Sequence, residues 1–97
     1  MNKVNIFKAL ASDTRLSIIN MLDNNNLCAC KIVEELNLTQ STISHHMKIL
    51  EDAKLVNITK VGKWHHYSIN SDTFKELEIY FSKIEENKFI SGGCNCD

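Results

Sequence analysis

The sequence predicts a mainly α-helical domain with one small β-hairpin, in the order ααααββα. Three observations lead to this prediction: proline is absent and glycine occurs only three times, apolar residues recur at helical spacing over most of the chain, and the period changes to about two after Lys54. A length of 97 residues is typical of one domain with one core. We expect that domain to occupy residues 1–91, followed by a flexible Cys-x-Cys tail over residues 92–97.

The first four predicted helices each carry an apolar stripe at three- or four-residue spacing. The stripes are Val4, Phe7 and Leu10, in a helix that stops near Ala11; Leu16, Ile19 and Leu22, with Ile18 beside them; Ile32, Val33 and Leu36; and Ile43, Met47 and Leu50. Ser12 or Asp13 is expected to cap the second helix, and the polar residues 23–26 form the turn after it.

A very short connection joins the third and fourth helices. Asn37 tolerates the left-handed conformation that ends a helix, and Thr39 can cap the helix that follows. Two helices joined by so short a turn must cross steeply, which is the helix-turn-helix arrangement.

The rest of the chain predicts a β-hairpin followed by a long helix. Residues 55–59 and 64–69 are β-rich, and residues 60–63 form the turn, with Gly62 available for positive φ. A last helix begins after residue 72, and its apolar positions form a narrow seam suited to another helix: Phe74, Leu77, Phe81 and Ile84. The complete order predicts a winged helix-turn-helix.

The charge of the chain is segregated, although its net value is only −1. That net value excludes a globally basic nucleic-acid binder but leaves room for a local basic face. Residues 39–50 contain no carboxylate, and residues 53–71 contain three lysines and no carboxylate. The candidate DNA contacts are the polar side chains outside the fourth apolar stripe and the lysines beside the hairpin turn: Gln40, Ser41, Thr42, Ser44, His45, Lys48, Lys60 and Lys63. The alternative is an ordinary solvated helix surface. His46 lies on the inner side of its helix and is expected to be packed and hydrogen-bonded.

The cysteines occur as two Cys-x-Cys pairs, Cys28/Cys30 and Cys94/Cys96. In a reducing compartment, clustered thiols indicate soft-metal ligands or redox sensors. Residues two apart in a regular helix point in different directions, but at the start of a helix Cys28 and Cys30 can converge. The helix start also lowers thiol pKa values, which favours the metal-binding thiolate. The alternatives are two small packed side chains at the first pair and an incidental tail at the second.

Other sequence features bear on the compartment. The longest apolar runs last two to four residues, too short for a transmembrane helix. The first residues lack the unbroken apolar segment of a signal peptide, so we expect a cytoplasmic protein that does not associate with membranes.

Four segments occur in a specific order: residues 9–16 read ALASDTRL, residues 27–32 read LCACKI, residues 41–50 read STISHHMKIL and residues 62–69 read GKWHHYSI. Together they resemble the ArsR/SmtB family of bacterial metal-responsive repressors, over about residues 7–69. The resemblance implies a homodimeric winged helix that binds a palindromic operator and is released when metal binds. It also implies that the first and last helices form the dimer interface.

One position departs from the pattern of the arsenic-sensing members of that family. They carry Cys-x-Cys-x-x-Cys at the start of the third helix, and here Cys28 and Cys30 match the first two cysteines while Val33 occupies the third position. Inorganic arsenite prefers three sulfur ligands, so a further thiolate must come from Cys94 or Cys96. The family also has a zinc site on its last helix, which we expect to be absent because no histidine follows residue 66.

The leading hypothesis is a cytoplasmic repressor whose operator binding is relieved by arsenite, antimonite or an organoarsenical held by Cys28, Cys30 and one or both of Cys94 and Cys96. A second hypothesis keeps the repressor but makes its signal cadmium, lead or zinc, or thiol oxidation or a persulfide. A third is a thiol protein that does not bind DNA, such as a metal buffer or an interaction winged helix. We expect neither an enzyme nor an organic cofactor, because no nucleophile–base spacing or phosphate loop is present.

Overall fold

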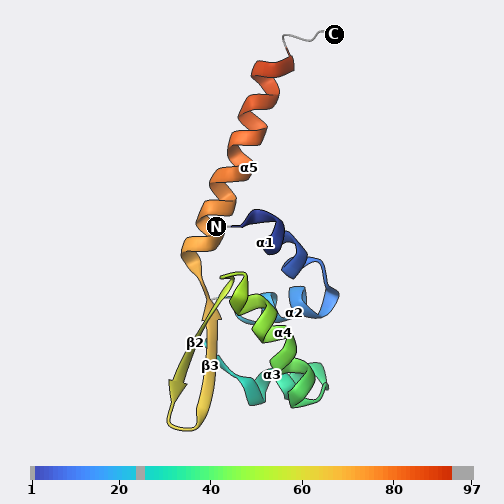
Figure 1. Cartoon of the computed structure of the whole chain (residues 1–97), viewed down its shortest axis with the longest axis vertical. Helices are drawn as coiled ribbons and strands as arrows, with labels where there is room; N and C mark the ends of the chain where they lie inside the picture. The colour runs from blue at the N-terminus through green and yellow to red at the C-terminus, as the bar shows by residue number, and fades with distance from the viewer. Residues whose placement is uncertain (1, 24–25, 93–97) are drawn as a thin grey trace.

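The computed structural model describes residues 2–23 and 26–92 and confirms the winged helix-turn-helix (Figure 1). Its elements in chain order are α1 (Lys3–Leu10), α2 (Asp13–Met21), β1 (Leu27–Cys28), α3 (Ala29–Leu36), α4 (Gln40–Asp52), β2 (Val56–Val61), β3 (Trp64–Ile69) and α5 (Ser71–Gly92). The one element that the sequence did not predict is β1, and α5 extends to the first residue of the predicted tail. No helix in the described ranges is both long enough and apolar enough to cross a membrane.

Side-chain caps explain where α1 and α2 begin. The side chain of Asn2 accepts the backbone N–H of Asn5 at 3.1 Å, and the Ser12 hydroxyl accepts that of Arg15 at 3.3 Å. Each bond satisfies one of the amide donors that the first turn of a helix leaves without a partner. Ser12 is thus the cap of α2, and Asp13 is its first residue, where a negative charge suits the helix dipole.

The three strands form an antiparallel sheet in the order β1–β3–β2. In β2 and β3, Val61 stands opposite Trp64, so the connecting turn is Gly62 and Lys63 alone. Gly62 has a φ of 63°, which glycine adopts without strain. The predicted four-residue turn was wrong, because pairing continues to Val61 and places Lys60 inside β2, opposite His65.

The short strand β1 connects the start of α3 to the hairpin of β2 and β3, which we call the wing. Leu27 pairs with Tyr67, and Cys28 pairs with His66. A strand of two residues has no period that a sequence pattern can reveal, since its pairing comes entirely from the neighbouring strand.

The core lies where α4 meets the other elements. The predicted stripe of Ile43, Met47 and Leu50 is fully buried, which confirms its orientation. The other buried apolar residues are Ile6, Ala9, Ile18, Leu22, Ile32, Ala53, Leu55, Val56, Tyr67 and Leu77. These residues come from α1, α2, α3, β2, β3 and α5 or from the loops beside them, so α4 is held on several sides.

The predicted stripes of the first two helices face the core only in part. In α1, Ile6 and Ala9 are buried, while Val4 is 60% exposed. At the end of α2, Leu22 is buried as predicted, whereas Leu16 is 45% exposed. Both helices carry apolar residues on more than one face, so spacing alone cannot select the face that meets the core.

The helix α5 projects away from the rest of the domain (Figure 1). Its first turns are anchored, because Leu77 is buried and the Thr73 hydroxyl donates to the Lys54 carbonyl oxygen. Farther along, Phe81 and Ile84 are about half exposed, at 52% and 50%. The predicted seam therefore begins in the core and continues onto the surface.

Candidate nucleic-acid interface and thiol site

The steep crossing between α3 and α4 is produced by residues 37–39. Asn37 has a φ of 53°, the left-handed conformation that was expected at the end of α3. The Thr39 hydroxyl oxygen accepts the backbone N–H of Thr42 at 3.1 Å and thereby caps α4. The first turn of α4 is left pointing outward from the domain, as a helix that enters a DNA groove requires.

The side chains of α4 that were predicted to contact DNA lie on the solvent side of the helix. The structure shows as exposed Gln40, Ser41, Thr42, Ser44, His45 and Lys48. The Lys48 ammonium is 3.2 Å from the Asp52 carboxylate, and both side chains are more than 60% exposed. An ion pair this exposed contributes less than about 1 kcal/mol, so a phosphate can compete for the lysine.

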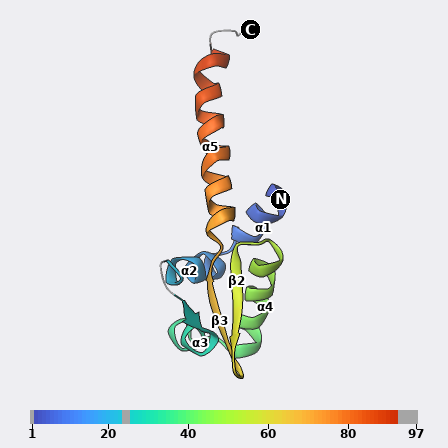
Figure 2. The same cartoon turned by 90° about the vertical axis from the view of Figure 1, so that its left-hand side faces the viewer.

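The two lysines of the wing lie at different positions along the hairpin. Lys63 lies in the turn, with its ammonium 5.5 Å from the centroid of the Trp64 ring, and Lys60 is an exposed residue of β2. The tip of the hairpin and the first turns of α4 lie at the same end of the molecule (Figure 2). The lysine-bearing wing therefore stands beside the polar face of α4.

The thiols of Cys28 and Cys30 converge, as expected for the start of a helix. Cys28 caps α3 with extended backbone angles, φ −68° and ψ 146°, so its side chain is not directed by the helical rotation. Its sulfur accepts the backbone N–H of Cys30 at 3.4 Å and lies 2.7 Å from the Cys30 sulfur. Two sulfur atoms are thus presented together at one point of the surface.

The hydrogen bond between these thiols makes them electrostatically unequal. The Cys30 S–H donates to the Cys28 sulfur, which lowers the pKa of Cys28 below its ordinary value, and the Cys30 backbone N–H lowers this pKa further. The same bond raises the pKa of Cys30, with burial and the Cys28 charge adding to the increase. Cys28 is therefore the more acidic thiol of the pair, and the thiolate is the form that binds soft metals and attacks electrophiles.

A cavity of about 200 Å³ connects the thiol pair to both elements predicted to bind DNA. It is lined by Cys28, Ala29, Cys30, Gln40, Ser44, Lys63, Trp64, His65 and Tyr67. The sequence did not identify Trp64 and Tyr67 as neighbours of the thiols. Only the pairing of β1 with β3, which sets Leu27 opposite Tyr67, brings them there.

The pair is not a complete metal site within the described ranges. No cluster of three or more His, Cys, Asp or Glu side chains suited to a metal ion occurs in residues 2–23 and 26–92. The other two predicted ligands, Cys94 and Cys96, lie outside the described residues. The described part of the chain supplies two thiol donors, Cys28 and Cys30.

Another predicted role concerns the adjacent histidines of α4. His45 is exposed, whereas His46 is half-buried, with its Nδ1 atom 3.1 Å from Nη1 of Arg15. His46 is therefore packed and hydrogen-bonded, as expected. The sequence did not reveal that its partner is Arg15 of α2, since nothing in the local pattern links residues so far apart.

Comparisons with known proteins agree with this geometry. Residues 12–57 match the family described as "Bacterial regulatory protein, arsR family". An uncharacterized HTH-type transcriptional regulator of Methanocaldococcus jannaschii is 47% identical over 73 residues, covering 74% of this chain and 82% of that protein. The arsenical resistance operon repressor of Staphylococcus xylosus is 42% identical over 91 residues, covering 94% of this chain and 85% of that protein. HlyU from Vibrio cholerae N16961 has a similar structure, with a TM-score of 0.72, 30% identity, and coverage of 84% of this chain and 89% of that chain.

These relatives are regulators of transcription and not enzymes, and their likeness extends beyond the helix-turn-helix to most of the chain. The polar face of α4 and the wing beside it agree with DNA binding as the shared activity. The chain belongs to the arsR family of bacterial regulatory proteins and is a DNA-binding transcriptional repressor with a winged helix-turn-helix fold.

Proposed function

We propose that this repressor binds palindromic operator DNA as a homodimer in the cytoplasm and is released when trivalent arsenic or antimony binds its thiolates. The ligands are Cys28 and Cys30, joined by one or both of Cys94 and Cys96. The observation that supports this most directly is the 2.7 Å approach of the two sulfurs inside the cavity shared with α4 and the wing. The arsenical resistance operon repressor of S. xylosus, similar over nearly the whole chain, supports the choice of arsenic.

The donor set suits a soft ion. Thiolates select soft metals over hard ones, and the lowered pKa of Cys28 supplies one thiolate readily. Arsenite needs a third sulfur, which Cys94 or Cys96 would provide. An organoarsenical already carries one carbon substituent on arsenic, so Cys28 and Cys30 suffice for its two remaining bonds.

The position of the cavity explains how a bound ion would weaken DNA binding. An ion on the two sulfurs occupies the space that Gln40 and Ser44 line on α4 and that Lys63 lines on the wing. These are three of the proposed DNA contacts. A bound ion would therefore hold these side chains in an arrangement different from the one that DNA requires. Allosteric coupling is typically about 1–3 kcal/mol, whereas near-complete switching requires roughly 5.5 kcal/mol. Several sulfur–arsenic bonds formed in one state only can supply that difference.

Exposed apolar side chains support the homodimer. Val4 and Phe7 on α1 and Phe81 and Ile84 on α5 are at least 37% exposed, and the rings of Phe7 and Phe81 lie 5.9 Å apart. We call these four residues the α1/α5 apolar face. Such a surface joins two helices of one chain and fits a second copy, as the resemblance implied.

The convergence of the thiols also favours a second candidate signal, thiol oxidation. Two thiols this close can form a disulfide, with two protons and two electrons passing to a peroxide or a persulfide. Cadmium, lead or zinc are further ions that a thiolate site can hold if Cys94 and Cys96 complete it. All of these signals act at the same pair and leave the DNA-binding face as described.

A gel shift tests the proposal. The duplex that precedes the coding sequence of this chain is titrated with the protein, and the complex is then challenged separately with arsenite, phenylarsine oxide, cadmium and hydrogen peroxide. We expect arsenite to release wild-type protein and to leave a Cys28→Ser variant bound. Release of that variant at the wild-type arsenite concentration would contradict the thiol mechanism. Release by cadmium or peroxide alone would favour the corresponding alternative signal.

A further inference from the structure

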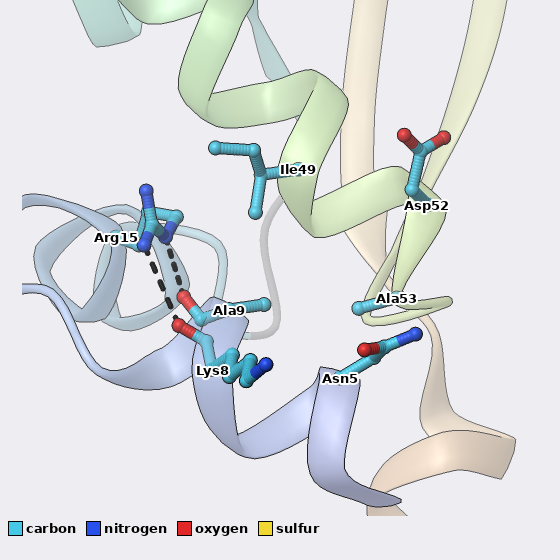
Figure 3. Close-up of a pocket in the computed structure, with 7 residues that line it drawn as sticks. All are labelled: Asn5, Lys8, Ala9, Arg15, Ile49, Asp52 and Ala53. Atoms are coloured by element: carbon cyan, nitrogen blue, oxygen red, sulfur yellow. Dashed lines mark hydrogen bonds between the residues drawn. The ribbon is translucent and has the colours of Figure 1, made fainter. Parts of the chain in front are cut away.

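One arginine side chain joins three helices of the domain. Arg15 lies in the first turn of α2, and its Nε and Nη2 atoms donate to the backbone carbonyl oxygens of Ala9 and Lys8, at the end of α1 (Figure 3). Its third nitrogen, Nη1, lies 3.1 Å from Nδ1 of His46 on α4. Arg15 therefore connects α1 to the helix that carries the DNA contacts.

The chemistry of each contact fixes the direction of its hydrogen bond. The last carbonyl groups of a helix lack amide partners and carry partial negative charge, so a guanidinium beside Lys8 and Ala9 is stabilising. Arginine has donors only, because it stays protonated in proteins. Nδ1 of His46 must then be the acceptor, which leaves the imidazole neutral with its proton on Nε2.

The surroundings of His46 favour that neutral form. Burial lowers its pKa, and the positive charge of Arg15 and the neighbouring His45 lower it further. Of the other charged groups near this contact, Lys8 of α1 and Asp52 of α4 line the pocket beside Arg15 (Figure 3). The charged groups of α3 and β2 are exposed residues: Lys31, Glu34, Glu35 and Lys60.

We propose that Arg15 is a positioning residue for DNA binding, which acts through His46 to hold α4 at one orientation relative to α1. The inference rests on the proposed homodimer, in which α1 contributes Val4 and Phe7 to the interface. In a two-fold dimer, the separation of the two DNA-reading helices must match the spacing of the half-sites. Within each protomer, the Arg15–His46 contact helps to fix the position of α4 relative to α1, and thereby the separation of the two α4 helices.

This link gives DNA binding a pH dependence of defined sign. Protonation turns Nδ1 of His46 from an acceptor into a donor, and the bond from Arg15 is lost. Affinity for the operator therefore falls as the pH decreases below about 6.5, the ordinary histidine value, towards the lowered pKa of His46.

Two conservative variants test the inference. Arg15→Lys keeps the charge but cannot donate to three acceptors in a planar fork. His46→Asn keeps an acceptor close to the Nδ1 position but cannot be protonated. The probes are the duplex that precedes the coding sequence and a shuffled duplex of the same composition, at about pH 7.5 and about pH 5.5. His45→Asn is the matched control, since it makes the same replacement at the neighbouring position and leaves the Arg15–His46 bond intact.

We expect Arg15→Lys to bind the native duplex about tenfold more weakly at the higher pH, with a smaller loss on the shuffled duplex. His46→Asn should keep near wild-type affinity at the higher pH and lose the weakening on acidification. The DNA binding of His45→Asn should weaken on acidification as that of the wild type does.

The inference is overturned if folded Arg15→Lys binds as wild type does, or if His46→Asn weakens on acidification as much as wild type. Should Arg15→Lys fail to fold by circular dichroism, the pH profiles of the two asparagine variants decide alone. A wild-type chain that bound neither duplex would remove DNA binding itself, whereas wild-type binding with unchanged variants removes only the role of Arg15.

Discussion

The two ends of this molecule differ in the polarity of the side chains that they expose. At the end formed by α3, α4 and the wing, the exposed side chains of α4 are polar, and the wing exposes its lysines beside Val61 and Trp64. At the other end, α1 and α5 expose Phe7, Phe81 and Ile84 to solvent. The first end thus presents a largely polar helix face, which suits DNA, whereas the second presents neighbouring apolar side chains on two helices, which suits another apolar surface.

This difference separates the part of the molecule that contacts DNA from the part proposed to join two protomers. In the proposed homodimer, each protomer would bind one half-site, and binding both half-sites at once would raise the affinity. A ligand at Cys28 would then act on both half-sites, because each protomer carries the same thiol pair. Substitutions at the two ends should therefore have separable effects.

The largest effect is expected at the α1/α5 apolar face. Phe81→Lys places a charge in the proposed interface, so the dimer should dissociate and operator affinity should fall by about a hundredfold or more. Sedimentation equilibrium and DNA titration measure the two quantities. Ile79→Lys is the matched control, because Ile79 is 51% exposed on the same helix but lies off the seam. If both variants remain dimeric, the interface lies elsewhere.

The next effect concerns the reactivity of the thiol pair. Cys30→Ala removes the donor that lowers the pKa of Cys28, so this pKa should rise towards its ordinary value of 9.0. A smaller fraction of Cys28 is then thiolate near neutral pH, and iodoacetamide should modify it several-fold more slowly. Mass spectrometry of the peptide that contains Cys28 gives the rate at each pH. An unchanged pH profile would show that the Cys30 thiol does not stabilise the Cys28 thiolate.

A smaller effect is expected at the wing. Lys63→Gln should weaken binding to native and shuffled duplexes alike and reduce the slope of log affinity against log salt by about one. Lys75→Gln on α5 is the control, as Lys75 is exposed and does not belong to the predicted DNA contacts. Equal salt slopes for both variants would place Lys63 away from the phosphates.

The smallest effect is on stability. Thr39→Ala removes the cap of α4 and should lower the free energy of unfolding by about 1 kcal/mol. Thr39→Ser keeps the capping hydroxyl and should lose much less. Urea denaturation compares the three proteins, and equal losses for alanine and serine would rule out the hydrogen bond to Thr42 as the source.

Local patterns predicted most of the fold. Asn37 and Thr39 predicted the turn between α3 and α4, and Gly62 predicted the hairpin. These predictions succeeded because each residue acts through its own backbone or through an amide a few residues away. The convergence of Cys28 and Cys30 followed from the same local reasoning. By contrast, the inner faces of α1 and α2 were predicted only in part, since a helix with apolar residues on several sides is oriented only by what it packs against.

The sequence by itself determined the order of the five helices and the hairpin, the caps of α2 and α4, the left-handed end of α3, the polar face of α4 and the proximity of the paired thiols. The tertiary structure alone decided that β1 joins the wing, that the thiols share a cavity with Gln40, Ser44 and Trp64, and that Arg15 meets His46. The physical reason is distance along the chain. Caps and turns are satisfied within a few residues, whereas a cavity between strand, helix and hairpin exists only after their register and packing have been set together.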